Sequence, residues 1–182
     1  WQIKIREDAK WNNGDPINAD TFMFTFKQQL DPVMMPRMST FLASNAITIV
    51  NAEQYSMQNA EGGIATAWED VGIKKIDDYT IQITTVDVNT ADQVMNHFYN
   101  RNSVPCYEPL WNECLSSDGL TTSYGSDLDH FMGCGPYIFD TWTYDSVQTY
   151  VKNPDHWMAE YFNYDEVQYR VVPEQNARIE LW

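Results

Sequence analysis

The sequence has little positive charge, few cysteines and no long apolar run. Lys and Arg number 11 against 26 Asp and Glu, which gives a formal net charge of -15 at pH 7. Such a chain repels phosphate groups, and its basic residues do not cluster, which argues against nucleic-acid binding and against an anionic membrane surface. The lack of a long uncharged apolar stretch argues against a membrane-spanning helix. We interpret the acidity as that of a solvated surface.

Cysteine is too scarce to form a disulfide framework. The three cysteines are Cys106, Cys114 and Cys134, which allow at most one internal disulfide and leave a thiol over. Their number and spacing specify neither which cysteines would form a disulfide nor the cellular compartment of the protein. Because no pattern of a histidine base accompanies Cys134, we interpret it as a small buried apolar residue rather than a nucleophile.

The sequence also lacks the short motifs of catalysis and cofactor binding. It contains no G-x-S-x-G, P-loop or G-x-G-x-x-G pattern. The histidines, His97, His130 and His156, are too far apart to give a metal-ligand spacing. Asp127 and Asp129 begin like a calcium loop, but a third oxygen ligand and the turn glycine are missing. We therefore expect no metal, no cofactor and no enzyme activity.

One enzyme class stays open on the residues alone. The excess of carboxylates would permit a glycoside hydrolase with paired acids, and 7 Trp with 11 Tyr would suit stacking on sugars. Most of these aromatics fall at strand-alternating or helix-face positions, where a core requires them. A secreted carbohydrate-binding or glycoside-hydrolase domain is therefore kept as the alternative function.

What the chain does contain is the pattern of a globular mixture of strands and helices. Hydrophobic residues make up 43% and aromatic residues 14%, enough to form a sizeable core. We expect strands or hairpins at 1–6, 71–86, 133–152 and 166–172, and helices at 19–30, 36–43, 50–58, 91–98, 109–114 and from 173 onward. Residues 115–132 are predicted to form a surface loop. Both ends fall inside predicted elements, so we expect a piece of a longer protein.

Two segments have specific local signals. Asn18 is a good N-cap for the helix beginning at Ala19, and the stretch from Lys10 to Pro16 contains the turn dipeptide Asn13-Gly14. The second segment is the hairpin after Gly133, whose first strand alternates regularly. In that alternation one face would carry Tyr137, Phe139 and Thr141, and the other Ile138, Asp140 and Trp142.

Three separated blocks place backbone-shaping residues in a specific order. The first runs from Arg6 to Phe22 as R-E-D-A-K-W-N-N-G-D-P-I-N-A-D-T-F, and the second from Val71 to Thr84 as V-G-I-K-K-I-D-D-Y-T-I-Q-I-T. The third combines G-C-G-P-Y at Gly133 with V-K-N-P-D-H-W ending at Trp157. In composition and spacing the blocks resemble the family 5 extracytoplasmic solute-binding proteins, the oligopeptide-binding receptors of ABC importers.

The resemblance implies a fold and a division of the chain. It implies an α+β fold with mixed sheets, hairpins and peripheral helices, forming one lobe of a periplasmic-binding-protein-like receptor of type II, cluster C. Residues 1–105 would form a smaller subdomain of that lobe and residues 106–182 part of the main subdomain. The residues that grip the peptide termini would lie mostly in the other lobe, outside this chain.

The resemblance also implies a function, partners and two site residues. It implies a receptor that captures oligopeptides outside the cytoplasmic membrane and delivers them to an ABC permease, in the periplasm or as a lipoprotein on the cell surface. Relatives carry peptides, nickel complexes, haem or oligosaccharides, so the ligand stays open. Met38 is predicted to line the interlobe cleft, with Phe41 one turn further on either at the ligand or in the core.

Overall fold

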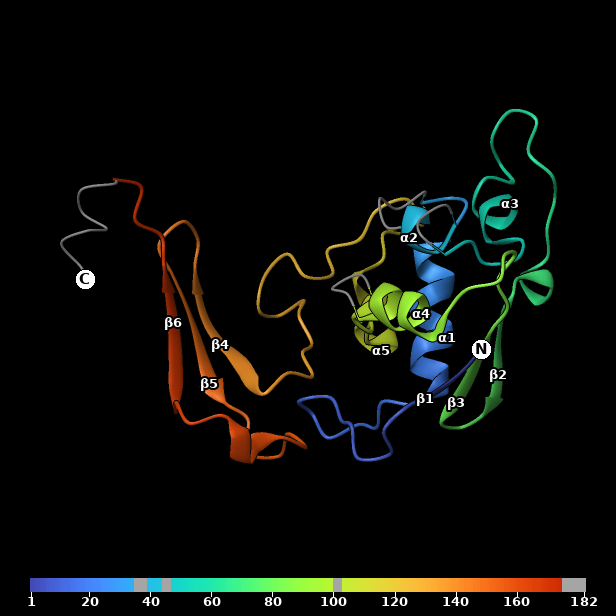
Figure 1. Cartoon of the computed structure of the whole chain (residues 1–182). Helices are drawn as coiled ribbons and strands as arrows, with labels where there is room; N and C mark the ends of the chain where they lie inside the picture. Colours follow the sequence, from blue (N-terminus) through green and yellow to red (C-terminus); the bar gives the residue numbers. More distant parts are fainter. Residues whose placement is uncertain (35–38, 44–46, 100–102, 175–182) are drawn as a thin grey trace. The chain divides into compact units, whose positions relative to one another are not determined.

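The computed structural model describes residues 1–34, 39–43, 47–99 and 103–174 of the chain (Figure 1). Its contacts divide the chain into two compact units. The first unit consists of Trp1–Glu7 and Ile17–Ser123, and the second of Asp8–Pro16 and Tyr124–Trp182. The subdomain boundary expected between residues 105 and 106 stays a prediction about the longer protein, because Cys106 groups here with the first unit.

The first unit contains a three-stranded sheet in the order β1-β3-β2. Its strands are β1 (Gln2–Lys4), β2 (Ile73–Asp77) and β3 (Thr80–Ile83). Both pairings are antiparallel, with Ile3 opposite Ile81 and Ile73 opposite Ile83. The predicted 71–86 hairpin is thus confirmed. A register shift between Lys75 and Asp77 leaves Ile76 50% exposed.

Helix α1 (Ala19–Gln29) begins where its N-cap predicts. The Asn18 side chain accepts a hydrogen bond from the Thr21 backbone N–H at 3.2 Å, and the Thr21 hydroxyl accepts one from the Asn18 N–H at 3.3 Å. This capping box satisfies backbone N–H groups that the start of a helix would otherwise leave unpaired. Phe26 and Leu30 are buried at 1% and 0% exposure, and α1 contacts β2 and β3.

Four short helices complete the described part of the first unit. They are α2 (Ser39–Ala43), α3 (Ala52–Ser56), α4 (Ala91–Phe98) and α5 (Glu108–Cys114), and a 3-10 turn, η1 (Trp68–Asp70), lies before β2. Residues 36–38 of the helix predicted at 36–43 lie outside the described residues. The prediction that a helix begins at Val50 is wrong, because the Val50 N–H donates to the Thr84 carbonyl and its own carbonyl accepts from Gly72, which places it beside the sheet.

The hydrophobic core of the first unit lies between α1, α2 and one face of the sheet. Twelve buried apolar residues form it: Ala19, Phe26, Leu30, Phe41, Leu42, Ala43, Ile49, Ala52, Val71, Ile73, Ile81 and Ile83. On α4, Val94 and His97 are buried, whereas the apolar Met95 is 68% exposed. The helix therefore uses a histidine as part of its inward face.

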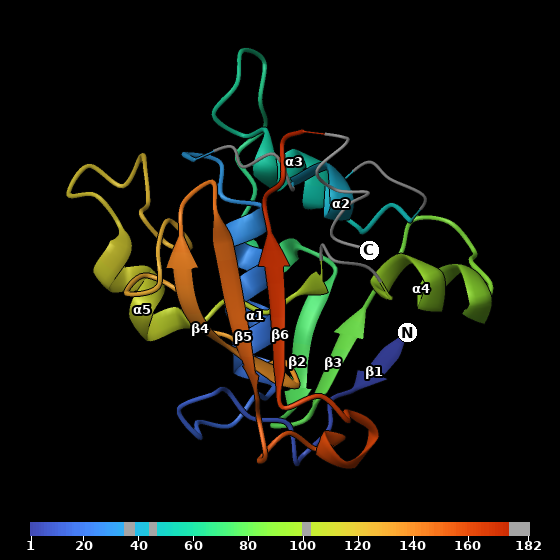
Figure 2. The same ribbon diagram turned by 90° about the vertical axis from the view of Figure 1, so that its left-hand side faces the viewer.

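The second unit contains a separate sheet in the order β4-β5-β6. Figure 2 shows β4 (Tyr137–Thr143), β5 (Val147–Lys152) and β6 (Glu166–Arg170) side by side. Asp145 takes a left-handed conformation, with φ of 52°, in the turn that joins β4 to β5. A 3-10 turn, η3 (Ala159–Tyr161), lies between β5 and β6. The hairpin after Gly133 and the following strand are thereby confirmed, although β6 ends before the predicted residue 172.

Two features of the predicted fold need correction. The pairings between the described strands are all antiparallel, whereas mixed sheets were expected, because adjacent strands β2–β3 and β4–β5 are joined by tight hairpins. Pro173 and Glu174 are not helical, and residues 175–182 of the helix predicted there lie outside the described residues. The α+β composition and the loop at 115–132 agree with the prediction.

Candidate functional site

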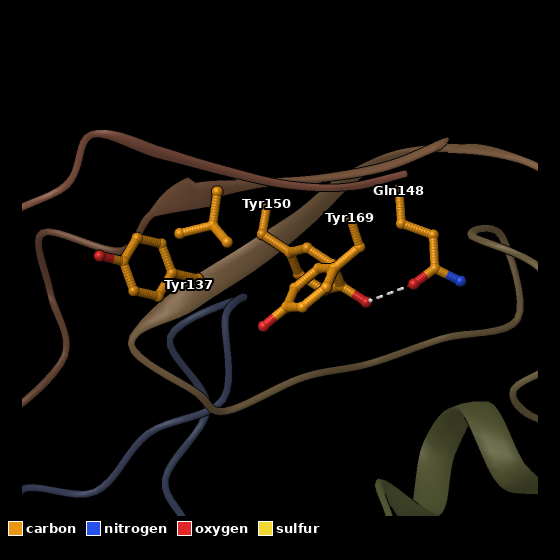
Figure 3. Close-up of a pocket in the computed structure, with 5 residues that line it drawn as sticks. Tyr137, Gln148, Tyr150 and Tyr169 are labelled. Carbon is orange, nitrogen blue, oxygen red and sulfur yellow. Dashed lines mark hydrogen bonds between the residues drawn. The ribbon is translucent and has the colours of Figure 1, made fainter. Parts of the chain in front are cut away.

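A recess lined by tyrosines lies on one face of the β4-β5-β6 sheet. It has a volume of about 470 Å³ and is lined by Tyr137, Gln148, Tyr150, Val167 and Tyr169 (Figure 3). The register explains why these side chains share a face: Gln148 lies opposite Tyr169, and Tyr150 lies opposite Val167. Residues two apart on a strand point to the same side of the sheet.

A β-bulge adds aromatic side chains to this face. The register between β4 and β5 shifts at Asp140, so that Phe139 pairs with Tyr150 and Trp142 pairs with Gln148. The Phe139 and Trp142 rings are 5.7 Å apart between centroids. The prediction that Trp142 faces away from Phe139 is therefore wrong, because one extra residue in a strand inverts the alternation beyond it.

The rings on this face pack against one another. Phe139 stacks on Tyr150 at 4.6 Å between ring centroids, and Tyr169 meets Tyr150 edge-on at 5.7 Å. Tyr137, which also lines the recess, meets Phe162 edge-on at 5.8 Å. Such offset and edge-to-face pairs are favourable beyond the area they bury.

The recess offers stacking surfaces and hydroxyl groups but no charged group among its lining residues. The Tyr150 hydroxyl donates to Gln148 Oε1 at 3.2 Å (Figure 3). Burial, and then the neighbouring Tyr169 phenol, raise the pKa of Tyr150 above its ordinary value. No carboxylate, imidazole or amine belongs to the described lining, so the recess presents aromatic rings, phenol hydroxyls and one side-chain amide. The geometry supports packing or binding.

A second site in the same unit joins two of the three sequence blocks. The Asn12 N–H donates to the Gly133 carbonyl at 2.9 Å. The Asn153 side-chain amide donates to the Gly135 carbonyl at 3.2 Å and to Asn12 Oδ1 at 3.4 Å, and its backbone N–H donates to the Pro136 carbonyl at 2.8 Å. Asn153 is only 6% exposed. Its side chain thus fastens the 8–16 loop to the start of the β4–β5 hairpin.

The shape of the 8–16 loop depends on Gly14 and Trp11. Gly14 has a φ of 92°, a conformation that L-residues rarely adopt, and its N–H donates to the Trp11 carbonyl. Trp11 is 4% exposed. The tryptophan and glycine of the first block therefore shape the backbone, and local sequence patterns gave no signal that this loop meets Asn153.

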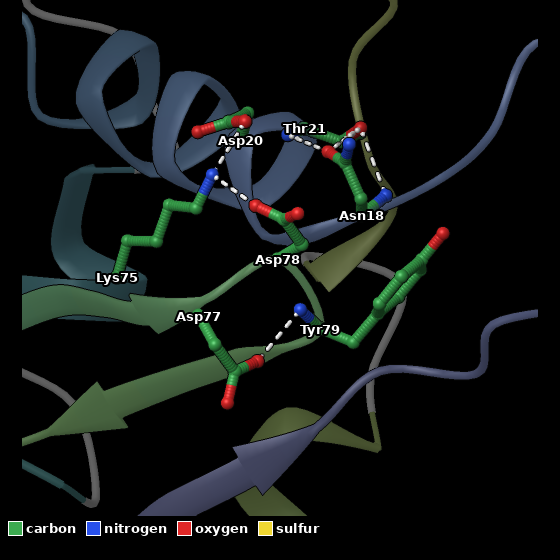
Figure 4. A network of polar contacts seen from close by, with 7 residues as sticks. All are labelled: Asn18, Asp20, Thr21, Lys75, Asp77, Asp78 and Tyr79. Carbon is green, nitrogen blue, oxygen red and sulfur yellow. Dashed lines mark hydrogen bonds and ion pairs between the residues drawn. The ribbon is translucent and has the colours of Figure 1, made fainter.

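The remaining block joins α1 to the β2–β3 hairpin in the first unit. Lys75 Nζ contacts Asp20 Oδ2 at 2.8 Å and Asp78 Oδ1 at 2.9 Å (Figure 4). The hydrogen bonds to Asp20 and then Asp78 raise the pKa of Lys75. The Asp78 carbonyl also accepts from the Ala19 N–H at 2.9 Å. These exposed pairs orient the helix start and form no ligand site.

The two predicted ligand residues have different outcomes. Met38 lies outside the described residues. Phe41 lies on α2, is 1% exposed and stacks on His97 with ring centroids 4.3 Å apart. Its side chain belongs to the core of the first unit, and any contact of Phe41 with a ligand stays a prediction.

The other sequence candidates show no reactive arrangement within the described ranges. Cys106, Cys114 and Cys134 form no disulfide among the described residues, and burial raises the pKa of Cys134. Asp127 accepts a hydrogen bond from the His130 backbone N–H at 3.0 Å, and its Oδ1 lies 2.6 Å from the His130 ring Nδ1. In the part of the chain that the structure describes, no group of three or more His, Cys, Asp or Glu could hold a metal ion, and no helix is long and apolar enough to cross a membrane.

Comparison with known proteins identifies the family. The family model of bacterial extracellular solute-binding proteins, family 5 middle, matches residues 1–181. The chain belongs to this family. Family 5 comprises solute-binding proteins, so the match supports a binding role and an extracellular setting and gives no support to the carbohydrate-active alternative.

Similar family 5 proteins include peptide-binding receptors. The dipeptide-binding protein DppE of Bacillus subtilis is 28% identical over 182 residues, which is 100% of this chain and 30% of DppE. The periplasmic oligopeptide-binding protein OppA of Escherichia coli is 22% identical over 157 residues, covering 86% of this chain and 26% of OppA. The chain therefore spans less than a third of the length of these relatives.

Solved structures agree on the fold. OppA of Listeria monocytogenes bound to peptide superimposes with a TM-score of 0.75 at 25% identity, covering 99% of this chain and 32% of that one. The pheromone receptor PrgZ gives a TM-score of 0.79 at 23% identity, with 99% and 32% coverage. The blocks recognised in the sequence thus belong to a family 5 fold.

Proposed function

We propose that the protein containing this chain is the substrate-binding component of an ABC importer and captures oligopeptides outside the cytoplasmic membrane. The observation that carries the proposal is the family match over residues 1–181, together with relatives named as dipeptide- and oligopeptide-binding proteins. The permease in the membrane is the second partner, to which the loaded receptor delivers its peptide. No nucleic acid takes part.

The physics of peptide capture suits a two-lobed receptor. An extended peptide pairs its backbone like an added strand, which gives affinity that is independent of side chains. Hydrated pockets accommodate different side chains because bridging waters adapt their hydrogen bonds. Closure of the lobes about a hinge removes the peptide from bulk water.

This chain supplies only part of such a site. A peptide brings a charged amine and a charged carboxylate, and burying either requires a counter-charge. The residues that line the tyrosine-lined recess carry none. As the family resemblance implies, we assign the groups that grip the peptide termini to the other lobe of the longer protein, with residues 1–105 as a smaller subdomain and 106–182 as part of the main one.

Met38 is the residue of this chain that we place at the ligand. In the sequence it directly precedes α2, whose Phe41 is buried in the core of the first unit. Replacing Met38 by Asp in the full receptor should lower peptide affinity about tenfold or more, since it introduces a charge into an apolar contact. Met38→Leu is the matched control, and equal affinity of Met38→Asp and wild type would refute the assignment.

Calorimetric titration tests the proposed function directly. The full receptor should bind short peptides, whereas the 182-residue chain alone should give no measurable heat of binding. An oligosaccharide series serves as the control ligand. Peptide binding by the isolated chain would contradict the assignment of the peptide-gripping groups to the other lobe. Binding of sugars instead of peptides by the full receptor would contradict the proposed function.

Localisation follows the same proposal. Family 5 proteins are extracellular, and a receptor that delivers to a permease must stay near the membrane. We place the protein in the periplasm or, as a lipoprotein, on the outer face of the cytoplasmic membrane. Fractionation of cells, with detection of the protein in the membrane fraction before and after detergent, separates the two arrangements.

A further inference from the structure

His97 is a buried ionisable residue to which no role has been given. It is 6% exposed on α4 and lies between aromatic side chains. Its ring stacks on Phe41 of α2, with centroids 4.3 Å apart and planes at 4°, and meets the Phe98 ring edge-on at 5.0 Å and 82°. The imidazole is thus a packing element between two helices.

The hydrogen bonding of His97 suits the neutral ring. One ring N–H donates to the Phe41 carbonyl, and among the described residues Nε2 has no partner, so that the donor is Nδ1. With Nδ1 protonated, Nε2 is an unprotonated acceptor in an apolar setting. A proton on Nε2 would create a buried charge and a buried donor without an acceptor, both of which are costly.

Among the described residues, no charged side chain of the neighbouring helices stands ready to compensate that charge. The five residues of α2 include no ionisable side chain, and Asp92 on α4 is exposed more than a turn away. On α1, which packs on Phe98 through Phe26, Asp20 and Lys27 are exposed. Burial lowers the pKa of His97 below its ordinary 6.5, and the Phe41 carbonyl opposes this in part.

We propose that His97 makes the contact between α2 and α4 sensitive to protons, so that mild acid loosens the packing of these two helices. The neutral imidazole packs between Phe41 and Phe98 at no charge cost, whereas the imidazolium would be a buried charge with an unpaired Nε2 donor among the described residues. Proton uptake then favours a locally opened state in which the ring reaches water.

The direction of the pH effect follows from the linkage between proton binding at His97 and opening of the helix packing. In the opened state the pKa of His97 returns to about 6.5, while in the packed state it is lower. The opened state therefore binds more protons in the interval between the two values, and the packing weakens as pH falls through that interval. The equilibrium constant for opening should rise by up to about tenfold per pH unit within it.

The consequence for ligand binding rests on the proposed function. Met38 directly precedes α2, so that loosening α2 would disturb the position that we place at the peptide. Peptide affinity of the full receptor should then fall in mild acid, and the receptor would release its ligand more readily there.

Segment-resolved hydrogen exchange on the full receptor tests whether protonation of His97 loosens the packing of α2 and α4. Exchange rates of segments 39–43 and 91–98, corrected for the intrinsic effect of pH, should rise by up to about tenfold per unit as pH falls below about 6.5. In His97→Gln, which keeps a donor for the Phe41 carbonyl but does not titrate, the rise should disappear. His130→Gln, at an exposed histidine, should retain it. A rise that persists in His97→Gln, or none in wild type, would overturn the proposal.

Two further measurements keep the test decisive. If His97→Gln fails to fold, NMR titration of the wild-type imidazole replaces it: a pKa below 6.5 supports the device, and one at or above 6.5 overturns it. Peptide affinity is measured in parallel at neutral and mildly acid pH. A receptor that binds no peptide at any pH refutes the proposed function, while the exchange data still decide the role of His97.

Discussion

The two units of this chain are stabilised by different kinds of contact. In the first unit, twelve buried apolar residues pack between helices and sheet. In the second unit, the buried apolar residues among those described are Ala9 and Trp11, and among its described strand residues only the polar Thr149, at 7% exposure, is buried. The second unit relies instead on half-buried aromatic pairs and on the hydrogen bonds of Asn153. One chain thus combines an apolar core with a sheet fastened by polar contacts.

The largest expected effect tests the core of the first unit. Phe26→Ala should reduce the free energy of unfolding of this unit by about 3 to 5 kcal/mol, because the 1% exposed ring leaves a cavity. Denaturant unfolding with hydrogen exchange of α1 measures the loss. Met95→Ala, on an exposed side chain, is the control and should have little effect. A loss below about 1 kcal/mol for Phe26→Ala would break the contrast between the units.

The next effect tests the polar attachment in the second unit. Asn153→Ala removes the buried amide that donates to Gly135 and Asn12, and should cost about 2 kcal/mol because two part-buried acceptors lose their donor. Hydrogen exchange in β4 and β5 should accelerate while α1 keeps its protection. Asn163→Ala, at an exposed asparagine of the same unit, is the matched control. Unchanged exchange in the hairpin would mean that ring contacts alone hold it.

The smallest expected effect tests how much a polar contact contributes to the stability of the first unit, where an apolar core dominates. Asn18→Ala removes the capping box of α1 and should cost about 1 kcal/mol, whereas Asn18→Ser should retain most of the stability. Thermal unfolding of the two variants measures the difference. If the cost equalled that of Asn153→Ala or exceeded it, polar contacts would matter as much in the first unit as in the second.

The sequence predicted features whose causes are local. Asn18 caps its helix, and the β2–β3 and β4–β5 hairpins form where turn residues separate alternating runs. The family could also be identified from the sequence, because the three blocks that mark it consist of residues that shape the backbone. Local sequence patterns predict caps and turns well because only a few residue types can occupy these positions.

Features set by distant partners were not predictable in this way. The bulge at Asp140 depends on pairing with β5, and Val50 lies beside the sheet because Gly72 and Thr84 bond to it. The burial of His97 follows from the position of Phe41, more than fifty residues earlier. The sequence alone left two roles for Phe41, ligand contact and core packing, because its environment depends on the distant helix α4.

The bond between Asn12 and Asn153 has a consequence for the order of events at the ribosome. Its partners are 141 residues apart, so the 8–16 loop lacks these partners until the last third of the chain has emerged. At about 5 to 20 residues per second this interval is roughly 7 to 28 s. During it, the Asn12 side chain is synthesised but has no Asn153 amide to bond to, so the nascent 8–16 loop is not yet anchored to the hairpin.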